Sequence, residues 1–378
     1  MPTSVLRGAL AAAIALLTFA TPAAAEVPAV RGATLGLSRP TGPHQVGTTT
    51  LHLVDDSRPD PWVPEERARE LMVSLWYPSR ASHGRRAPYM TPEESSLLLE
   101  GQGVDGVPGE VLSGTRTNAF VDAPPLGHGL PLVVLSPGFT LPRSSLTALA
   151  EDLASRGYVV AGIDHTYESF GTALPGGRTA TCVACQSWGS PEFGDRTTRG
   201  RAADVSFVID RLTGPRPAWR YSGLIDPSRI GMAGHSIGGN SATWTMLGDP
   251  RVRAGINMDG TFHIPVPDGG LSRPFMLMGA GKIHEPGGRD TTWGRDWLRM
   301  TGWKRWLTVD GMDHTSFTDY PLFAGRLGVD TGASISGPRA VAITREYVGA
   351  FFDLHLRGRS RPLLDGPSRR FPEARFWP

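Results

Sequence analysis

The sequence predicts a doubly wound α/β fold with a mostly parallel sheet, and two observations support this. From residue 131 onward, short continuous apolar runs alternate with longer segments that carry apolar residues at helical spacing. Such runs are typical of strands buried on both faces of a parallel sheet, and their alternation with helices indicates that helices cover both faces. With 378 residues, 40% of them hydrophobic, the chain can bury a large core.

The segments before residue 131 are expected to form one edge of the sheet. Residues 30–77 alternate polar and apolar side chains, which predicts two or three antiparallel strands. Residues 78–130 are rich in Gly, Pro and Ser and predict a long surface excursion with one short helix at 92–100.

The later segments are expected to alternate between strand and helix. Apolar runs predict strands at 131–136, 158–163, 229–233, 252–258, 274–278 and 306–309. Apolar residues at helical spacing predict helices at 144–156, 198–212, 240–247 and 338–356, with a loop insertion at about 166–195. Because loops at the carboxyl ends of parallel strands converge on one crevice, functional residues are expected directly after these strands.

The first 25 residues differ from the rest of the chain. Arg7 precedes a short apolar run, which ends in Ala23-Ala24-Ala25. One positive charge, an apolar run shorter than the roughly 20 residues of a membrane span, and an Ala-x-Ala site are typical of a secretory signal peptide. We therefore expect cleavage after Ala25 and a secreted, soluble single domain over residues 26–378. Retention as an uncleaved anchor is the alternative.

Charge and cysteine content narrow the functional classes. The formal net charge is +2 and the arginines are scattered, so no nucleic-acid partner is expected. The two cysteines, Cys182 and Cys185, lie in a Gly- and Thr-rich stretch. In an oxidising compartment they are expected to form a small-loop disulfide that pins a surface loop; a redox role or half of a zinc site are the alternatives.

A Gly-x-Ser-x-Gly motif stands at residues 234–238, directly after a predicted strand and before a predicted helix. A strand-to-helix turn this tight strains the serine backbone and presents Oγ at the crevice, while the glycines let neighbouring chains pass without Cβ clashes. We therefore expect Ser236 to be a nucleophile. An ordinary Gly-rich turn is the alternative.

A serine nucleophile needs a base, and in α/β-hydrolases the base is a histidine that follows the acid in the chain. Among the histidines beyond Ser236, His314 is the expected base because it comes just after the last predicted parallel strand. His284 and His263 follow the two preceding strands and are the alternatives.

The acid that orients the base is expected at another strand end. Asp259 directly follows the strand at 252–258, so its carboxylate can point into the crevice and stabilise the imidazolium. Asp290, in the loop after the next strand, is the second choice, and Asp313, adjacent to the base, is the third.

Two backbone N–H groups are expected to form an oxyanion hole. One belongs to Ile237, the residue after the nucleophile, and the other to the loop after the first buried strand. In that loop Phe139 is chosen because Pro137 has no N–H and Gly138 frees the turn.

These motifs resemble the plasma and intracellular type II platelet-activating-factor acetylhydrolase family over roughly residues 70–355. The resemblance rests on Ser-Pro-Gly-Phe at 136–139, Gly-His-Ser-Ile-Gly-Gly at 234–239, Met-Asp-Gly at 258–260 and Gly-Met-Asp-His at 311–314. It implies an α/β-hydrolase fold and a calcium-independent serine esterase that releases short or oxidised sn-2 acyl groups from phospholipids. It also implies Ser236, Asp259 and His314 as the triad. Pro137 departs from the family, whose animal members have His there.

A group of aromatic residues has two readings. Trp293, Trp297 and Met300 fall at helical spacing and are followed by Trp303 and Trp306. They either pack on the core or roof an acyl pocket and make transient contact with a lipid surface.

The leading hypothesis is a secreted serine ester hydrolase of lipid or small-molecule esters, with no cofactor and no metal. A cutinase-like or polyester-degrading carboxylesterase and a catalytically silent hydrolase-fold binding module are the alternatives.

Overall fold

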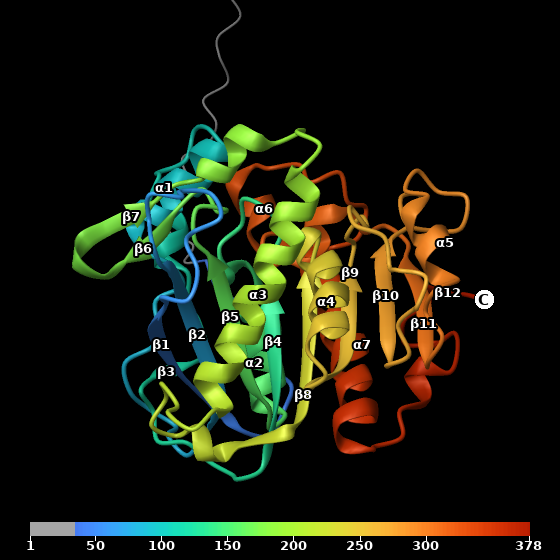
Figure 1. Ribbon diagram of the computed structural model, residues 1–378, viewed down its shortest axis with the longest axis horizontal. Helices are drawn as coiled ribbons and strands as arrows, with labels where there is room; N and C mark the ends of the chain where they lie inside the picture. Colours follow the sequence, from blue (N-terminus) through green and yellow to red (C-terminus); the bar gives the residue numbers. More distant parts are fainter. Residues whose placement is uncertain (1–34) are drawn as a thin grey trace, which may run out of the picture.

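The computed structural model describes residues 35–378, in which a central sheet is covered by helices on both faces (Figure 1). The predicted signal peptide, residues 1–25, lies outside the described residues. The strands of the sheet are β1 Gln45–Asp55, β2 Arg69–Ser79, β3 Phe120–Val121, β4 Leu130–Ser136, β5 Val159–His165, β8 Ile225–His235, β9 Val252–Met258, β10 Phe275–Ala280, β11 Lys304–Val309 and β12 Ala374–Trp377.

The order of the strands places a crevice beside β4. Within the described residues the sheet runs β12-β11-β10-β9-β8-β4-β5-β2-β1-β3. The central strands β5, β4, β8, β9, β10 and β11 are mutually parallel, and β2 and β12 pair antiparallel at the two sides. Since β5 and β8 lie on opposite sides of β4, the chain reverses direction across the sheet there, and the carboxyl ends of β4 and β8 flank the ligand-binding crevice of such folds.

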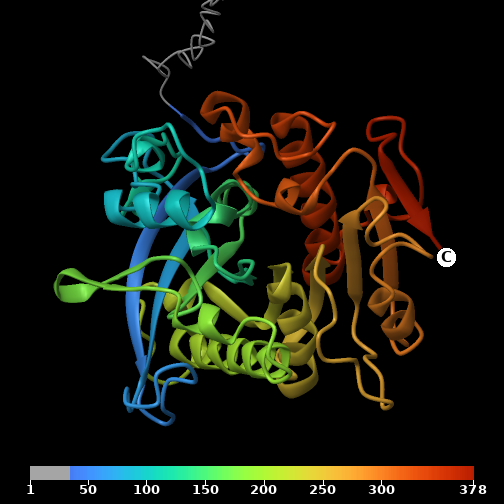
Figure 2. The same cartoon turned by 90° about the horizontal axis from the view of Figure 1, so that it is seen from above.

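The helices form one layer on each face of this sheet. Their bounds are α1 Pro92–Gly101, α2 Thr147–Ser155, α3 Phe193–Thr213, α4 Ile237–Gly248, α5 Thr292–Trp297, α6 Pro321–Leu327 and α7 Gly337–Arg357. The view from above separates α3 and α4 on one face from α2 and α7 on the other (Figure 2). The buried strand β4 serves both layers, because Val133 and Leu135 pack in the cluster of α2 and α7, whereas Leu132 and Val134 pack in that of α3 and α4. The predicted α/β fold class is confirmed.

The excursion at 78–130 is less exposed than the sequence predicts. Leu98 and Leu99 of α1 are buried together with Tyr89, and they pack in one cluster with Phe323 of α6 and Val341 of α7. The surface description was therefore wrong for this part. Apolar residues scattered among Gly, Pro and Ser gave too little periodicity to reveal this packing.

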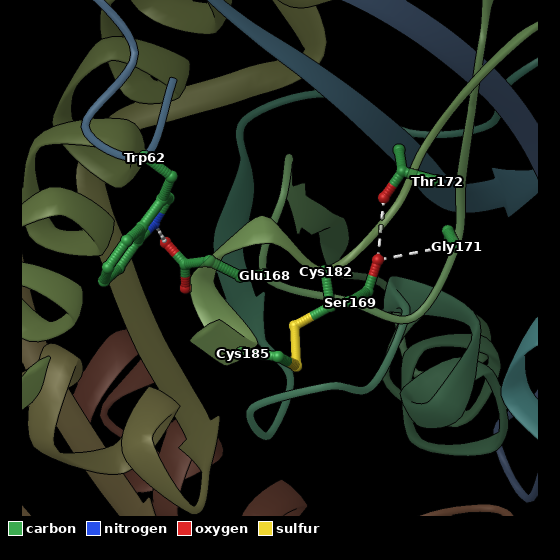
Figure 3. The surroundings of a disulfide bond; sticks show 7 residues. All are labelled: Trp62, Glu168, Ser169, Gly171, Thr172, Cys182 and Cys185. Carbon is green, nitrogen blue, oxygen red and sulfur yellow. Dashed lines mark hydrogen bonds between the residues drawn. A yellow bond between two sulfur atoms is a disulfide. The ribbon is translucent and has the colours of Figure 1, made fainter. Parts of the chain in front are cut away.

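The loop insertion at 166–195 carries the hairpin β6 Thr172–Leu174 and β7 Arg178–Ala180, and α3 already begins at Phe193. Cys182 and Cys185 are joined by a disulfide, as predicted (Figure 3). The loop is also tied to the body of the molecule, because the Trp62 indole N–H donates to Glu168 at 2.8 Å (Figure 3).

The aromatic residues near α5 pack on the core. Trp293 is fully buried, Trp306 is 4% exposed, and their rings meet edge to face. The core reading is confirmed, and the alternative of an aromatic pocket roof is wrong. Within residues 35–378, no helix combines the length and the apolar character needed to cross a membrane.

Candidate active site

Ser236 occupies the turn between β8 and α4 in a strained conformation, with φ 56° and ψ −129°. Its N–H donates to the Met258 carbonyl at 2.8 Å, which ties the turn to the end of β9. The close approach requires glycine: a Cβ on Gly239 would lie 2.0 Å from Asn257 Oδ1, and one on Gly238 would lie 2.3 Å from the Ser136 carbonyl oxygen. The turn therefore holds Oγ at the crevice, as the motif predicts.

The three residues proposed as a triad meet in one line of hydrogen bonds. His314 Nε2 lies 3.0 Å from Ser236 Oγ, and His314 Nδ1 lies 2.6 Å from Asp259 Oδ2. A carboxylate only accepts, so Nδ1 carries the proton and Nε2 is free to accept the serine proton. Asp259 is fully buried, whereas the His314 side chain is 48% exposed, so the line runs from the interior to the surface.

The alternative acids and bases have other partners. Asp313 caps the short 3₁₀ turn His314–Phe317 and accepts from the Ser316 N–H, so it shapes the segment that carries His314. His284 and Asp290 form a chain of hydrogen bonds behind Asp259: His284 Nδ1 is 2.6 Å from Asp259 Oδ1, and His284 Nε2 is 3.0 Å from Asp290 Oδ2.

Asp259 remains ionised in this buried setting. Burial would raise the pKa of its carboxyl, but hydrogen bonds from His284 and His314 outweigh this and hold the pKa well below its usual range. The Ala280 N–H donates a further hydrogen bond at 2.6 Å. Among the described residues, no cluster of three or more His, Cys, Asp or Glu side chains is arranged to hold a metal ion.

His235 fixes the backbone of His314. Because a carbonyl only accepts, His235 Nε2–H donates to the His314 carbonyl, at 2.8 Å, and the two rings lie 4.6 Å apart. Burial, and then the nearby His314, lower the pKa of His235 to about 3, so its ring stays neutral.

The loop after β4 faces this line of residues. In the described part of the chain, neither the Phe139 nor the Ile237 N–H donates a hydrogen bond to protein, so both predicted oxyanion donors are available. The loop is held on its far side by Thr140, whose N–H donates to the Glu168 carbonyl at 2.8 Å and whose carbonyl accepts from Phe170. Phe139 stacks on the exposed Trp188, with ring centroids 5.4 Å apart.

A cavity of about 430 Å³ opens over Ser236 and His314. Its apolar walls come from three segments, namely α1 with the turn that follows it, the loop after β4, and α6. The apolar side chains are Leu98, Leu99, Val104, Leu112, Phe139, Leu141, Phe323, Ala324, Leu327 and Val329. Such a lining suits the apolar part of a small ester.

Comparisons with known proteins identify relatives that are named as ester hydrolases. The sequence model of the family "Platelet-activating factor acetylhydrolase, isoform II" matches residues 32–174. A probable 1-alkyl-2-acetylglycerophosphocholine esterase of Arthroderma benhamiae is 28% identical over 90% of this chain and 93% of its own length. The solved structure of a ferulic acid esterase from Streptomyces cinnamoneus is 46% identical, with a TM-score of 0.83, over 92% of this chain and 100% of that chain. The chain is therefore similar to the platelet-activating factor acetylhydrolase isoform II family over residues 32–174, and to named esterases over 90% and 92% of its length. It is an ester hydrolase of the α/β-hydrolase type.

A third relative matches a shorter part of the chain. A bis(hydroxyethyl) terephthalate hydrolase of Streptomyces coelicolor is 32% identical over 39% of this chain and 38% of its own length. The isoform II family model itself ends at residue 174, so it includes the loop after β4 but stops before Ser236.

A buried polar network lies beneath the loop after β4, and the sequence analysis did not predict it. Arg201 of α3 donates to the Pro137 carbonyl and, at 2.6 Å, to Glu168. The other oxygen of Glu168 accepts from the Trp62 indole, as Figure 3 shows. The signal was present in the sequence, because Arg201 falls in the same helical stripe as Val205, Val208, Ile209 and Leu212. A charged residue in an apolar stripe indicates a buried partner.

The network contains a second serine–histidine–aspartate line that has no access to the cavity. His165 Nε2 is 2.9 Å from Ser136 Oγ and its Nδ1 is 2.8 Å from Asp204, and all three residues are at most 2% exposed. Asp204 also accepts from Arg69 at 2.9 Å. These groups connect the end of β4 to α3 and β2, so they help to hold the loop after β4 in place.

Proposed function

We propose that the chain is a serine carboxylic-ester hydrolase that works through an acyl-enzyme. Ser236 Oγ attacks the ester carbonyl carbon while His314 Nε2 takes the serine proton. Asp259 stabilises the resulting imidazolium, and the Phe139 and Ile237 N–H groups stabilise the tetrahedral oxyanion. His314 then protonates the leaving alcohol. A water molecule, deprotonated by the same imidazole, hydrolyses the acyl-enzyme and releases the acid.

The observation that carries this proposal is the pair of hydrogen bonds at 3.0 and 2.6 Å that join Ser236, His314 and Asp259 at the mouth of an apolar cavity. The test is stoichiometric labelling by a fluorophosphonate together with nitrophenyl acetate hydrolysis. We expect one label on Ser236 and a fall in kcat of at least about 10⁴-fold in Ser236→Ala. Ser228→Ala, an exposed serine at the far end of β8, serves as the control. Full activity of Ser236→Ala would refute the proposal.

We further propose that the acyl group is that of a small or aromatic carboxylic acid. Two findings support this: the relative at 46% identity is a ferulic acid esterase, and the exposed Asp330 is among the residues that line the apolar cavity over Ser236. An anionic side chain there disfavours a phosphate-bearing headgroup inside the cavity.

The second candidate substrate is a 2-acetyl phospholipid, which the relative from Arthroderma benhamiae supports through its name. The two candidates are separated by kcat/KM on an ester of ferulic acid, bis(hydroxyethyl) terephthalate and a 1-alkyl-2-acetyl phospholipid. We expect the aromatic esters to exceed the phospholipid by at least tenfold. The reverse order would favour the acetylhydrolase activity of the named relatives.

We also propose that the protein is exported after cleavage behind Ala25. The support comes from the composition of residues 1–25 and from the Cys182–Cys185 disulfide, because such bonds persist in oxidising compartments. N-terminal sequencing of protein recovered from the culture medium is expected to begin at Glu26. An intact Met1 on cell-associated protein would contradict export.

A further inference from the structure

A second histidine lies behind the acid of the proposed triad. His284, in the loop after β10, is 2% exposed, and its ring stacks on Trp293 at a centroid distance of 4.2 Å. Its Nδ1 lies 2.6 Å from Asp259 Oδ1 and its Nε2 lies 3.0 Å from Asp290 Oδ2. Asp259 thus lies between two imidazoles, one on each carboxylate oxygen.

The contacts of His284 fit only one protonation state. A neutral imidazole has one N–H and one lone pair, so one of its nitrogens would face a carboxylate oxygen without a proton between them. The imidazolium donates to both carboxylates and satisfies the buried charges. Burial alone would lower the pKa of His284, but hydrogen bonds to Asp259 and Asp290 outweigh it and raise the pKa to about 9.

We propose that His284 is a positioning residue that acts on His314 through Asp259 as a persistent imidazolium. His284 holds Oδ1 of Asp259, so that Oδ2 faces His314. Its positive charge also offsets part of the stabilisation that the Asp259 carboxylate gives to the doubly protonated form of His314. His314 therefore remains a free base at lower pH than it would beside an unshared carboxylate. The proposal rests on the proposed serine mechanism and adds a residue that sets the pH at which activity is lost on the acidic side.

The other polar groups around this cluster have partners besides His284. Asp290 also accepts from the hydroxyls of Thr261 and Thr292, and His263 lies close enough to interact with its charge. On the other side, the neutral His235 contacts His314, and Arg201 acts on His235 only through its charge.

The test is the pH profile of kcat/KM, whose acidic limb reports protonation of the base in the free enzyme. In His284→Gln we expect the midpoint of this limb to rise by about 1 pH unit, because a positive charge is removed near Asp259. In Asp290→Asn, which removes a negative charge, the midpoint is not expected to rise. His355→Gln is the matched control: His355 lies in α7 against Trp303, and burial lowers its pKa to about 4, so this substitution removes a neutral ring.

Fluorophosphonate titration of each variant separates the two proposals. If Ser236 is labelled stoichiometrically and the limb of His284→Gln stays at its wild-type midpoint, the role of His284 is refuted while the serine mechanism stands. If Ser236 is not labelled in the wild type, the serine mechanism itself fails.

A spectroscopic measurement covers the case in which His284→Gln does not fold. In ¹⁵N-histidine-labelled wild-type protein at pH 7.5, we expect His284 to show two protonated ring nitrogens, and the spectrum of Asp290→Asn provides the assignment. A neutral His284 ring at this pH would overturn the proposal.

Discussion

At the level of single residues, glycine is required near Ser236 at the positions where two segments of the chain come into close contact. Gly239 and Gly248 lie in the same helix, α4, yet a Cβ on Gly239 would meet Asn257 Oδ1 at 2.0 Å, whereas one on Gly248 would meet no atom within 4 Å. Asn257 cannot withdraw cheaply, because its side chain both donates to the Gly260 carbonyl and accepts from the Gly260 N–H, each at 2.8 Å.

This pair gives a matched prediction. We expect Gly239→Ala to lose at least 100-fold in kcat/KM or to fail to fold, since the clash moves either Ser236 or the Asp259 loop. Gly248→Ala is expected to keep full activity and to change stability by no more than about 1 kcal/mol. Ester hydrolysis and urea unfolding of both variants provide the check. Wild-type kinetics in Gly239→Ala would show that the turn tolerates a side chain.

Arg201 gives a second prediction at this scale. A lysine has a single ammonium group and cannot reach both Glu168 and the Pro137 carbonyl in the planar geometry that the guanidinium uses. We expect Arg201→Lys to lower kcat by at least tenfold with little change in KM, because the Phe139 N–H shifts away from the oxyanion. Arg199→Lys, exposed on the same helix, is the control. Equal kcat in both variants would mean that the network does not position the loop.

At the level of elements, the disulfide closes a very short segment, so its contribution to global stability is small. Cys182 and Cys185 are three positions apart, and the loop-closure model gives about 2 kcal/mol for such a ring. We expect the Cys182→Ser/Cys185→Ser double variant to lose at most about that amount in urea unfolding, without loss of fold. A loss above about 4 kcal/mol would show that the bond supports more than its own loop.

Strong periodicity made most elements predictable, and weak periodicity explains the misses. Long apolar runs and helical stripes placed the central strands and the helices α2, α3, α4 and α7 within a few residues. The edge strand β12 has four residues, too few for an alternation pattern to stand out, and its pairing with β11 depends on tertiary contact. The short helix α6 begins at Pro321 and has seven residues, too few for a helical stripe to stand out, and packing against α7 stabilises it.

The site was predictable to the extent that each residue follows a strand. Ser236, Asp259 and His314 could be chosen because the carboxyl ends of β8, β9 and β11 share one edge of the sheet. The arrangement of His284 between Asp259 and Asp290 could not be, because a lone histidine in a loop carries no signal about which carboxylates face it.

At the level of the whole molecule, the cluster of Asp259, His284 and Asp290 makes the free energy of unfolding fall at both acidic and alkaline pH. The folded pKa of His284, about 9, lies above the unfolded value of about 6.5, so its contribution is fully present below pH 6.5 and is lost as the pH rises through 9. The carboxyls of Asp259 and Asp290 have lowered pKa values, so their contribution is lost as the pH falls below about 4.

We therefore expect maximal stability near pH 5–7 and a loss of up to about 3 kcal/mol in the free energy of unfolding between pH 6.5 and 10. Urea titrations at several pH values measure this. The alkaline loss is expected to be smaller in His284→Gln, which lacks the titrating ring. An identical slope in this variant and the wild type would assign the alkaline loss to other groups.

Most of the walls of the cavity and the three residues of the proposed triad come from different parts of the chain. Ser236, Asp259 and His314 follow strands of the sheet, whereas most of the apolar lining comes from α1, the turn after it, the loop after β4 and α6. We therefore expect that ester preference can be exchanged between relatives: replacing the segments equivalent to 92–112 and 321–331 changes most of the cavity walls and leaves the residues of the proposed triad in place.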